Sequence, residues 1–144
     1  MKSLRYTAII LFATIILPAS SSAAIVCKAP DKSFKDFFVR FTEEIPFQQS
    51  RVIFPLVYRF GDYAMTTPLI ELWDSNKLKA FPHPLILSRS QRKVEGVNQS
   101  FLLVTPRYSE VFQDRQEADD YRILYKFRSV DGCWFLEDIH DKAL

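Results

Sequence analysis

The chain has 144 residues, of which 15% are aromatic and 25% charged, with 19 lysines and arginines against 17 aspartates and glutamates. This length suits one domain, and 13 phenylalanines offer ample material for an apolar core. Lys2 and Arg5 belong to a predicted targeting segment, so the rest of the chain has balanced charge, which argues against a nucleic-acid partner. Only three glycines are present, which argues against a glycine-rich phosphate-binding loop.

Residues 1–24 have the pattern of a secretory signal peptide. The apolar run Thr7 to Leu17 follows two basic residues and is shorter than the roughly 20 residues that span a membrane. Ser22-Ala23-Ala24 matches the small-x-small cleavage pattern, and an uncleaved anchor is the alternative. No small residue directly precedes Cys27, which argues against a lipid anchor. We therefore expect a single secreted or periplasmic α+β domain, residues 25–144, without stable membrane insertion.

Cys27 and Cys133 are the two cysteines of the chain. In an oxidising compartment an isolated pair usually forms a disulfide, which here would tie the mature N-terminus to the start of the last strand. In the chain-entropy model a loop of this length contributes about 4–5 kcal/mol to stability. We expect no metal site and no cofactor, because the cysteines and histidines do not cluster at ligand spacing.

A helix is predicted to begin after Ser33, a good N-cap residue. Four phenylalanines then recur at i, i+3, i+4 and i+7 and form one apolar stripe: Phe34, Phe37, Phe38 and Phe41. Ile45-Pro46 should end this helix, because a residue before proline avoids the α region. Val52 to Tyr58 is predicted to be a strand, placed at a sheet edge or a bulge because Pro55 cannot donate a ladder hydrogen bond.

The middle of the chain gives weaker signals. Leu69, Leu72 and Trp73 are spaced like a short helical stripe, and Leu85 to Leu87 is interpreted as a short strand. Ser88 to Lys93 is expected to be a solvated basic loop at a hairpin tip. The continuous apolar run Phe101 to Val104 is typical of a central strand buried on both faces.

The C-terminal part predicts a further strand around Tyr108 to Phe112 and then a hairpin from Tyr121 to Asp141. Apolar and polar residues alternate along both arms of the hairpin, and Asp131-Gly132 is a strong two-residue turn signal. Together these elements predict an N-terminal helix packed in a curved, mostly antiparallel sheet.

The segment Ser33 to Leu56, with its order Ser-Phe-x-x-Phe-Phe-x-x-Phe and then Phe-Gln-x-Ser-Arg-Val-x-Phe-Pro-Leu, resembles an uncharacterised family of secreted bacterial proteins. The closing segment Trp134 to Asp141 is similar to the last strand of nuclear-transport-factor-2-like (NTF2-like) domains. The resemblance implies a cone of helix and curved sheet. Cones of this type can host an acid–base pair formed by an aspartate and a tyrosine.

The candidate ligand-binding residues are Tyr58, Phe60, Asp62 and Tyr125. An acid–base pair could be formed by Asp62 with one of the tyrosines Tyr58, Tyr63 and Tyr125. The alternative is that these tyrosines simply pack in the core with their hydroxyls hydrogen-bonded. His83 and His140 are the two histidines, and both are more simply explained as loop or surface residues.

Three functions remain open at this point. The leading one is a non-enzymatic binding module for a small apolar ligand, which requires a pocket of a few hundred Å³ lined by aromatic residues. The second is an immunity-type protein that binds and neutralises a toxin, which requires an exposed apolar or acidic patch and a filled core. The third is an enzyme of ketosteroid-isomerase type, which requires a carboxylate with a shifted pKa in the pocket.

Overall fold

The computed structural model of the protein describes residues 25–61, 67–81, 84–116 and 120–143. The predicted signal segment and three candidate residues, Asp62, Tyr63 and His83, lie outside this part. The described helices are α1 (Phe34–Glu43), α2 (Ile45–Ser50), α3 (Ser75–Ala80) and α4 (Arg89–Glu95). The described strands are β1 (Val52–Phe60), β2 (Leu69–Trp73), β3 (Val97–Val104), β4 (Tyr108–Arg115), β5 (Arg122–Val130) and β6 (Cys133–Asp141).

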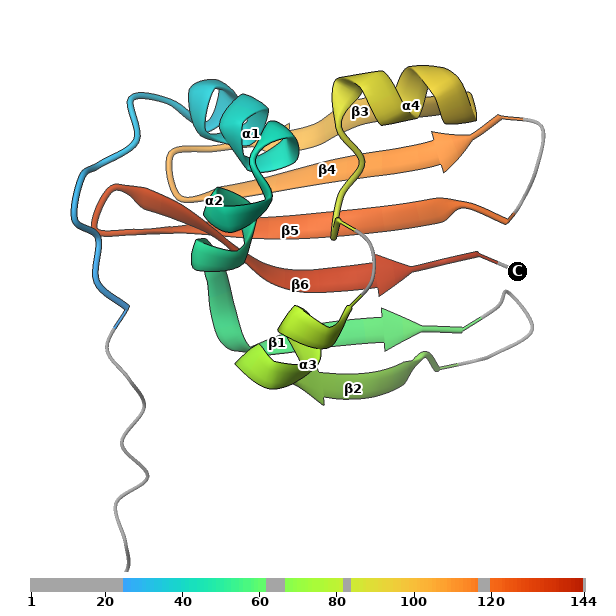
Figure 1. Cartoon of the computed structure of the whole chain (residues 1–144), viewed down its shortest axis with the longest axis horizontal. Coiled ribbons are helices and arrows are strands. Elements are labelled where there is room, and N and C mark those ends of the chain that lie inside the picture. Colours follow the sequence, from blue (N-terminus) through green and yellow to red (C-terminus); the bar gives the residue numbers. More distant parts are fainter. Residues whose placement is uncertain (1–24, 62–66, 82–83, 117–119, 144) are drawn as a thin grey trace, which may run out of the picture.

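The strands form one curved sheet in the order β2-β1-β6-β5-β4-β3 (Figure 1). Neighbouring strands run antiparallel, except for β1 and β6, which are parallel. The α+β class and the mostly antiparallel sheet predicted from the sequence are therefore confirmed. We call the face of the sheet that carries Phe127 its inner face, because the rings of α1 lie against that residue.

The bounds of α1 agree with the sequence prediction. Ser33 caps the helix by accepting a hydrogen bond from the backbone N–H of Asp36, at 3.1 Å. The four phenylalanines of the predicted stripe are buried, and each has its ring centroid within 5.8 Å of the Phe127 ring on β5. These T-shaped contacts form the dense part of the core.

The proline in β1 coincides with an irregularity rather than with an edge. β1 lies between β2 and β6, and its register against β6 shifts between Val52 and Val57, the interval that contains Pro55. The bulge predicted for this strand is thus present, and the alternative edge position is wrong.

Two short elements of the middle region were predicted in the wrong class. Leu69–Trp73 is the strand β2 and not a helix, because it pairs antiparallel with β1 and sets Trp73 opposite Leu56. Leu85 to Leu87 is not a strand but a buried loop, which we call the roof segment together with Pro84 and Ser88. Its backbone is held by side-chain amides instead of a neighbouring strand, since Gln48 accepts from the N–H of Leu85 at 2.8 Å and Gln113 from that of Leu87 at 3.3 Å.

Residues 88–93 are not a hairpin tip. They form most of α4, which begins with a capping box in which Ser88 and Gln91 exchange hydrogen bonds. Gly96 caps the C-terminus of α4, and its φ of 67° lies in the left-handed region that favours glycine.

β3 was predicted to be a central strand, and this is wrong. It is the last strand of the sheet and pairs with β4 alone among the described strands. Phe101 to Val104 are consequently 43–57% exposed. The β5–β6 hairpin, in contrast, is confirmed, with positive φ at both Asp131 and Gly132 in the turn.

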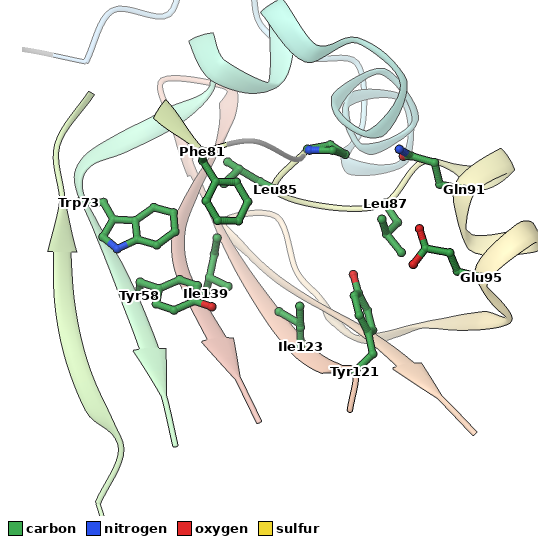
Figure 2. Close-up of a pocket in the computed structure, with 11 residues that line it drawn as sticks. Tyr58, Trp73, Phe81, Leu85, Leu87, Gln91, Glu95, Tyr121, Ile123 and Ile139 are labelled. Carbon is green, nitrogen blue, oxygen red and sulfur yellow. The ribbon is translucent and has the colours of Figure 1, made fainter. Parts of the chain in front are cut away.

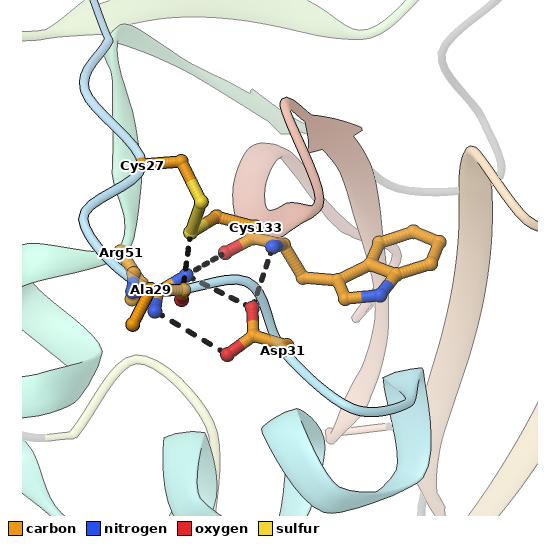
Figure 3. The surroundings of a disulfide bond; sticks show 6 residues. Cys27, Ala29, Asp31, Arg51 and Cys133 are labelled. Atoms are coloured by element: carbon orange, nitrogen blue, oxygen red, sulfur yellow. Dashed lines mark hydrogen bonds and ion pairs between the residues drawn. A yellow bond between two sulfur atoms is a disulfide. The ribbon is translucent and has the colours of Figure 1, made fainter.

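The N-terminal segment is fastened to the start of β6 (Figure 3). Cys27 and Cys133 form the expected disulfide, with their sulfur atoms 2.02 Å apart. Next to it, the Asp31 carboxylate accepts hydrogen bonds from Arg51 at 2.9 and 3.3 Å and from the backbone N–H of Trp134 at 2.8 Å. This group of contacts joins three parts of the chain that are far apart in sequence.

Candidate functional site

A cavity of about 290 Å³ lies between the inner face of the sheet and the roof segment (Figure 2). It is located toward the end of β6 that is remote from α1. Its lining comes from β1, β2, β5 and β6, from α4, and from the chain around the roof segment: Tyr58, Trp73, Phe81, Pro84, Leu85, Leu87, Gln91, Glu95, Tyr121, Ile123 and Ile139.

The floor of the cavity is set by strand register. Tyr58 on β1 and Tyr125 on β5 both pair with Ile139 on β6, and directly opposed residues share a face of the sheet. Ile123 lies two residues before Tyr125 and therefore on the same face. The inner face thus presents aliphatic side chains at the centre of the cavity floor, and Figure 2 shows Ile123 and Ile139 there.

One end of the cavity is an aromatic wall. The rings of Tyr58 and Trp73 are stacked, with centroids 4.5 Å apart and planes inclined by 16°, and Phe81 lies 5.3 Å from Trp73. The Tyr58 hydroxyl donates to Asp141 at 3.0 Å, and the indole N–H of Trp73 donates to Glu71 at 2.9 Å. Because both donors are already used, this wall offers mainly apolar ring surface to a ligand.

The other end is polar and is built by α4 and the start of β5. Gln91 and Glu95 are four residues apart on α4 and therefore lie on one face of the helix. Tyr121 reaches the same end, and its hydroxyl donates to Gln113 at 3.1 Å. In Figure 2 the Glu95 carboxylate points toward Leu87 and Tyr121.

The tyrosines of this region are held in their neutral form. Burial, followed by the charge of Asp141, raises the pKa of Tyr58. Burial is also the main cause that raises the pKa of Tyr121 and, well above its ordinary value, that of Tyr125. These phenols therefore remain protonated at neutral pH and act in hydrogen bonding.

The candidate residues from the sequence are only partly brought together. Tyr58 lines the cavity, whereas Phe60 is not among the lining residues and instead lies 5.9 Å from the Tyr58 ring. Tyr125 is on the same inner face but is fully buried and is not among the lining residues, with its hydroxyl 3.4 Å from that of Tyr121. Asp62 lies outside the described residues.

Three important lining residues were not singled out from the sequence: Trp73, Glu95 and Tyr121. Tyr121 could have been found, because it continues the alternating pattern of Ile123 and Tyr125. Trp73 was assigned to a helix, and Glu95 follows a stretch that was interpreted as a loop. His140 does not line the cavity, since it pairs with Leu124 and so lies on the opposite face from Ile139.

The described part of the chain also bears on metal binding and on membrane crossing. Within it there is no group of three or more histidine, cysteine, aspartate or glutamate residues that could hold a metal ion. None of the described helices has the length and apolar character needed to cross a membrane.

The fold and the cavity define a class: an α+β domain whose helices and roof segment cover one face of a curved sheet and leave a pocket there. No protein-family model and no curated protein matches the chain. Two solved structures share its fold. An NTF2-like protein from Bacteroides fragilis NCTC 9343 has a TM-score of 0.55 at 17% identity, over 83% of this chain and 50% of that protein. A cystatin-like protein from Bacteroides caccae ATCC 43185 has a TM-score of 0.51 at 21% identity, over 81% and 79% of the two chains.

These identities establish a likeness of fold alone. The expected similarity to NTF2-like domains is therefore confirmed at the level of fold. The chain spans half the length of the NTF2-like protein that it matches.

Proposed function

We propose that the protein is a non-enzymatic binding module that holds a small, largely apolar molecule in the cavity beneath the roof segment. The observation that carries this proposal is the combination of an aliphatic floor, an aromatic wall whose donors are already used, and a few polar groups at one end. Ligand sites typically have this composition, with volumes of roughly 300–1,000 Å³. The volume of about 290 Å³ corresponds to a compact ligand.

The predicted cone is, in this proposal, filled at one end and hollow at the other. The rings of α1 occupy the end around Phe127, where Phe41 and Phe127 are both fully buried. The opposite end, around Ile123 and Ile139, has the roof segment above it and keeps the cavity. The N-terminal helix then acts as the plug of the cone, and the remaining space is the ligand site.

The proposed location is secreted or periplasmic. The Cys27–Cys133 disulfide supports it, since structural disulfides persist mainly in oxidising compartments. A domain in such a compartment could carry, store or sense a small molecule, and the cavity is compatible with each of these uses.

The cavity favours this function over the two alternatives. The immunity-type protein was expected to have a filled core, whereas a cavity of about 290 Å³ lies on the inner face. The isomerase-type enzyme needs a tyrosine that donates a proton, and the raised pKa of Tyr58 and of Tyr125 makes both phenols weaker acids than a free tyrosine.

The test is binding of a neutral apolar fluorophore, N-phenyl-1-naphthylamine, to residues 25–144 with the disulfide intact. We expect saturable binding with one molecule per chain. Ile123→Trp should weaken it at least tenfold, because this half-buried floor residue lines the cavity and a larger ring would fill it. Leu103→Trp on β3 is the matched control and should bind as the wild type does, because Leu103 is 43% exposed outside the cavity.

Absence of binding, or binding that Ile123→Trp leaves unchanged, would reject the proposed site. Near-UV circular dichroism of both variants checks that the fold is retained. If Ile123→Trp proves unfolded, Leu87→Trp on the roof segment makes the same test from the opposite side of the cavity.

A further inference from the structure

We infer that the ligand carries a hydroxyl group on an apolar ring, and that Glu95 accepts the hydrogen bond from this hydroxyl at the α4 end of the cavity. This inference rests on the proposed function and specifies its ligand class. It also predicts selection against anionic ligands. Some polar groups around the cavity are already hydrogen-bonded, and others remain free to bind a ligand.

The hydroxyl cannot be recognised at the aromatic wall. Asp141 and Glu71 are the nearby acceptors there, and neither is among the lining residues. Asp141 accepts from the Tyr58 hydroxyl, and Glu71 accepts from the Trp73 indole and from the Lys77 ammonium group. These carboxylates are therefore engaged behind the rings.

Glu95 differs from these carboxylates in its partners. Arg115 is the nearest cation, but its Nη1 binds both carboxylate oxygens of Asp120 at 2.8 and 2.9 Å. Its Nε donates to the backbone carbonyl of Glu95 at 3.1 Å, and its Nη2 lies 3.7 Å from the Glu95 carboxylate. That separation is too long for a good hydrogen bond. Within the described residues, the Glu95 carboxylate thus keeps its acceptor sites open toward the cavity.

Gln91 supplies the complementary donor. Its side-chain oxygen accepts from the backbone N–H of Ser88 at 3.0 Å as part of the capping box. This bond fixes the orientation of the amide and leaves the Nε2 group to donate. A hydroxyl can donate to Glu95 and accept from Gln91 through a single oxygen atom.

The same geometry disfavours an anion. A carboxylate ligand would meet the negative charge of Glu95, whose side chain is 41% exposed and lies 3.7 Å from Arg115, and like charges in contact repel one another. A ligand without a donor would leave the Glu95 acceptor sites unmatched. A hydrogen bond to a charged group is typically worth enough to change affinity about tenfold.

Three naphthalenes of nearly equal size test the inference by isothermal titration calorimetry at pH 7: 2-naphthol, 2-methoxynaphthalene and 2-naphthoate. We expect 2-naphthol to bind about tenfold more tightly than 2-methoxynaphthalene, and 2-naphthoate to bind least well. Glu95→Leu should remove the advantage of 2-naphthol and leave the affinity for 2-methoxynaphthalene within about twofold. Glu95→Gln, which keeps a neutral acceptor, should give an intermediate result.

Glu110→Leu is the matched control. Glu110 pairs with Lys126 on β5, next to Tyr125, and so lies on the face of the sheet opposite the cavity. This variant should preserve the full preference for 2-naphthol.

The outcomes separate the inference from the proposed function. Equal binding of 2-naphthol and 2-methoxynaphthalene, or a preference that survives Glu95→Leu, would overturn the role of Glu95 and leave an apolar binding site standing. Tightest binding of 2-naphthoate would overturn the expected charge selection. If none of the three compounds binds at millimolar concentration, the proposed function itself fails.

Discussion

The contact between Asp31 and Arg51 should contribute more to stability than any other ion pair in the described part of the chain. Their side chains are 11% and 14% exposed, whereas at least one partner of every other described ion pair is 30% exposed or more. Asp31→Ala would leave the buried guanidinium of Arg51 without its carboxylate and the N–H of Trp134 without its acceptor.

Removing one partner of a buried ion pair typically costs about 3–5 kcal/mol. We expect a value near the lower end, about 3 kcal/mol, because Arg51 keeps other contacts. It donates to the Trp134 carbonyl at 3.3 Å and lies 4.8 Å from the centre of the Phe47 ring. The Cys27–Cys133 disulfide also keeps the segment close to β6.

The measurement is urea unfolding with the disulfide intact, as a double-mutant cycle of Asp31→Ala and Arg51→Met. The double variant contains no unpaired buried charge, so it should be more stable than the sum of the two single changes implies, by at least 1 kcal/mol. Asp36→Ala, at an exposed position in the first turn of α1, is a control and should cost clearly less than Asp31→Ala. A loss below 1 kcal/mol for Asp31→Ala would refute the reasoning.

Three further predictions concern other parts of the molecule. Replacing both Cys27 and Cys133 by serine should lower the free energy of unfolding by about 4–5 kcal/mol, measured by urea unfolding, because their bond closes a loop of 106 positions; an unchanged midpoint would contradict this. Leu102→Lys should reduce concentration-dependent light scattering and change stability by less than about 0.5 kcal/mol, because Leu102 is 57% exposed on an uncharged edge strand; equal scattering by both proteins would contradict this. The raised pKa of Tyr58 predicts that its contribution to stability, fully present below pH 10, is lost as the pH rises further and the unfolded chain ionises first. The midpoint temperature of thermal unfolding should therefore fall less steeply between pH 8 and 12 for Tyr58→Phe than for the wild type. Parallel plots of this midpoint against pH would argue against a raised pKa of Tyr58.

The parts of the fold that could be predicted are those whose signals are local and extend over several repeats. The stripe of α1 repeats over two helical turns, and Ser33 and Pro46 mark its limits. The β5–β6 hairpin combines alternation along both arms with the turn residues Asp131 and Gly132. In each case the local pattern and the tertiary contacts favour the same structure, so the prediction did not depend on knowing the neighbours.

The errors concern elements that are decided by partners distant in sequence. In Leu69–Trp73 the same residues satisfy a short helical stripe and a five-residue strand, and pairing with β1 decides between them. The apolar run Phe101 to Val104 gives no information on strand order, so its edge position had to come from the sheet topology. The segment after Ser88 has a clear capping box, but its basic character was given more weight than the glutamine three residues later.

The cavity was predicted as a possibility of the cone, but its location depends on side chains that carry no recognisable pattern. Tyr58 was found because it belongs to an aromatic strand. Trp73 and Glu95 belong to elements whose class was missed, and they form opposite ends of the cavity. A site assembled from β1, β2, α4 and β5 is a product of tertiary folding, so sequence spacing could identify only part of it.

Two buried glutamines explain why the roof segment stays above the sheet and does not collapse onto it. Gln48 and Gln113 are 1% and 0% exposed, and a buried amide is destabilising unless its hydrogen bonds are satisfied. Gln48 bridges the carbonyl of Phe41, at 3.1 Å, to the N–H of Leu85. Gln113 binds both the N–H and the carbonyl of Leu87 and also accepts from Tyr121. These bonds fix the height of the roof at two points, and the cavity is therefore a built feature of the fold rather than a packing defect.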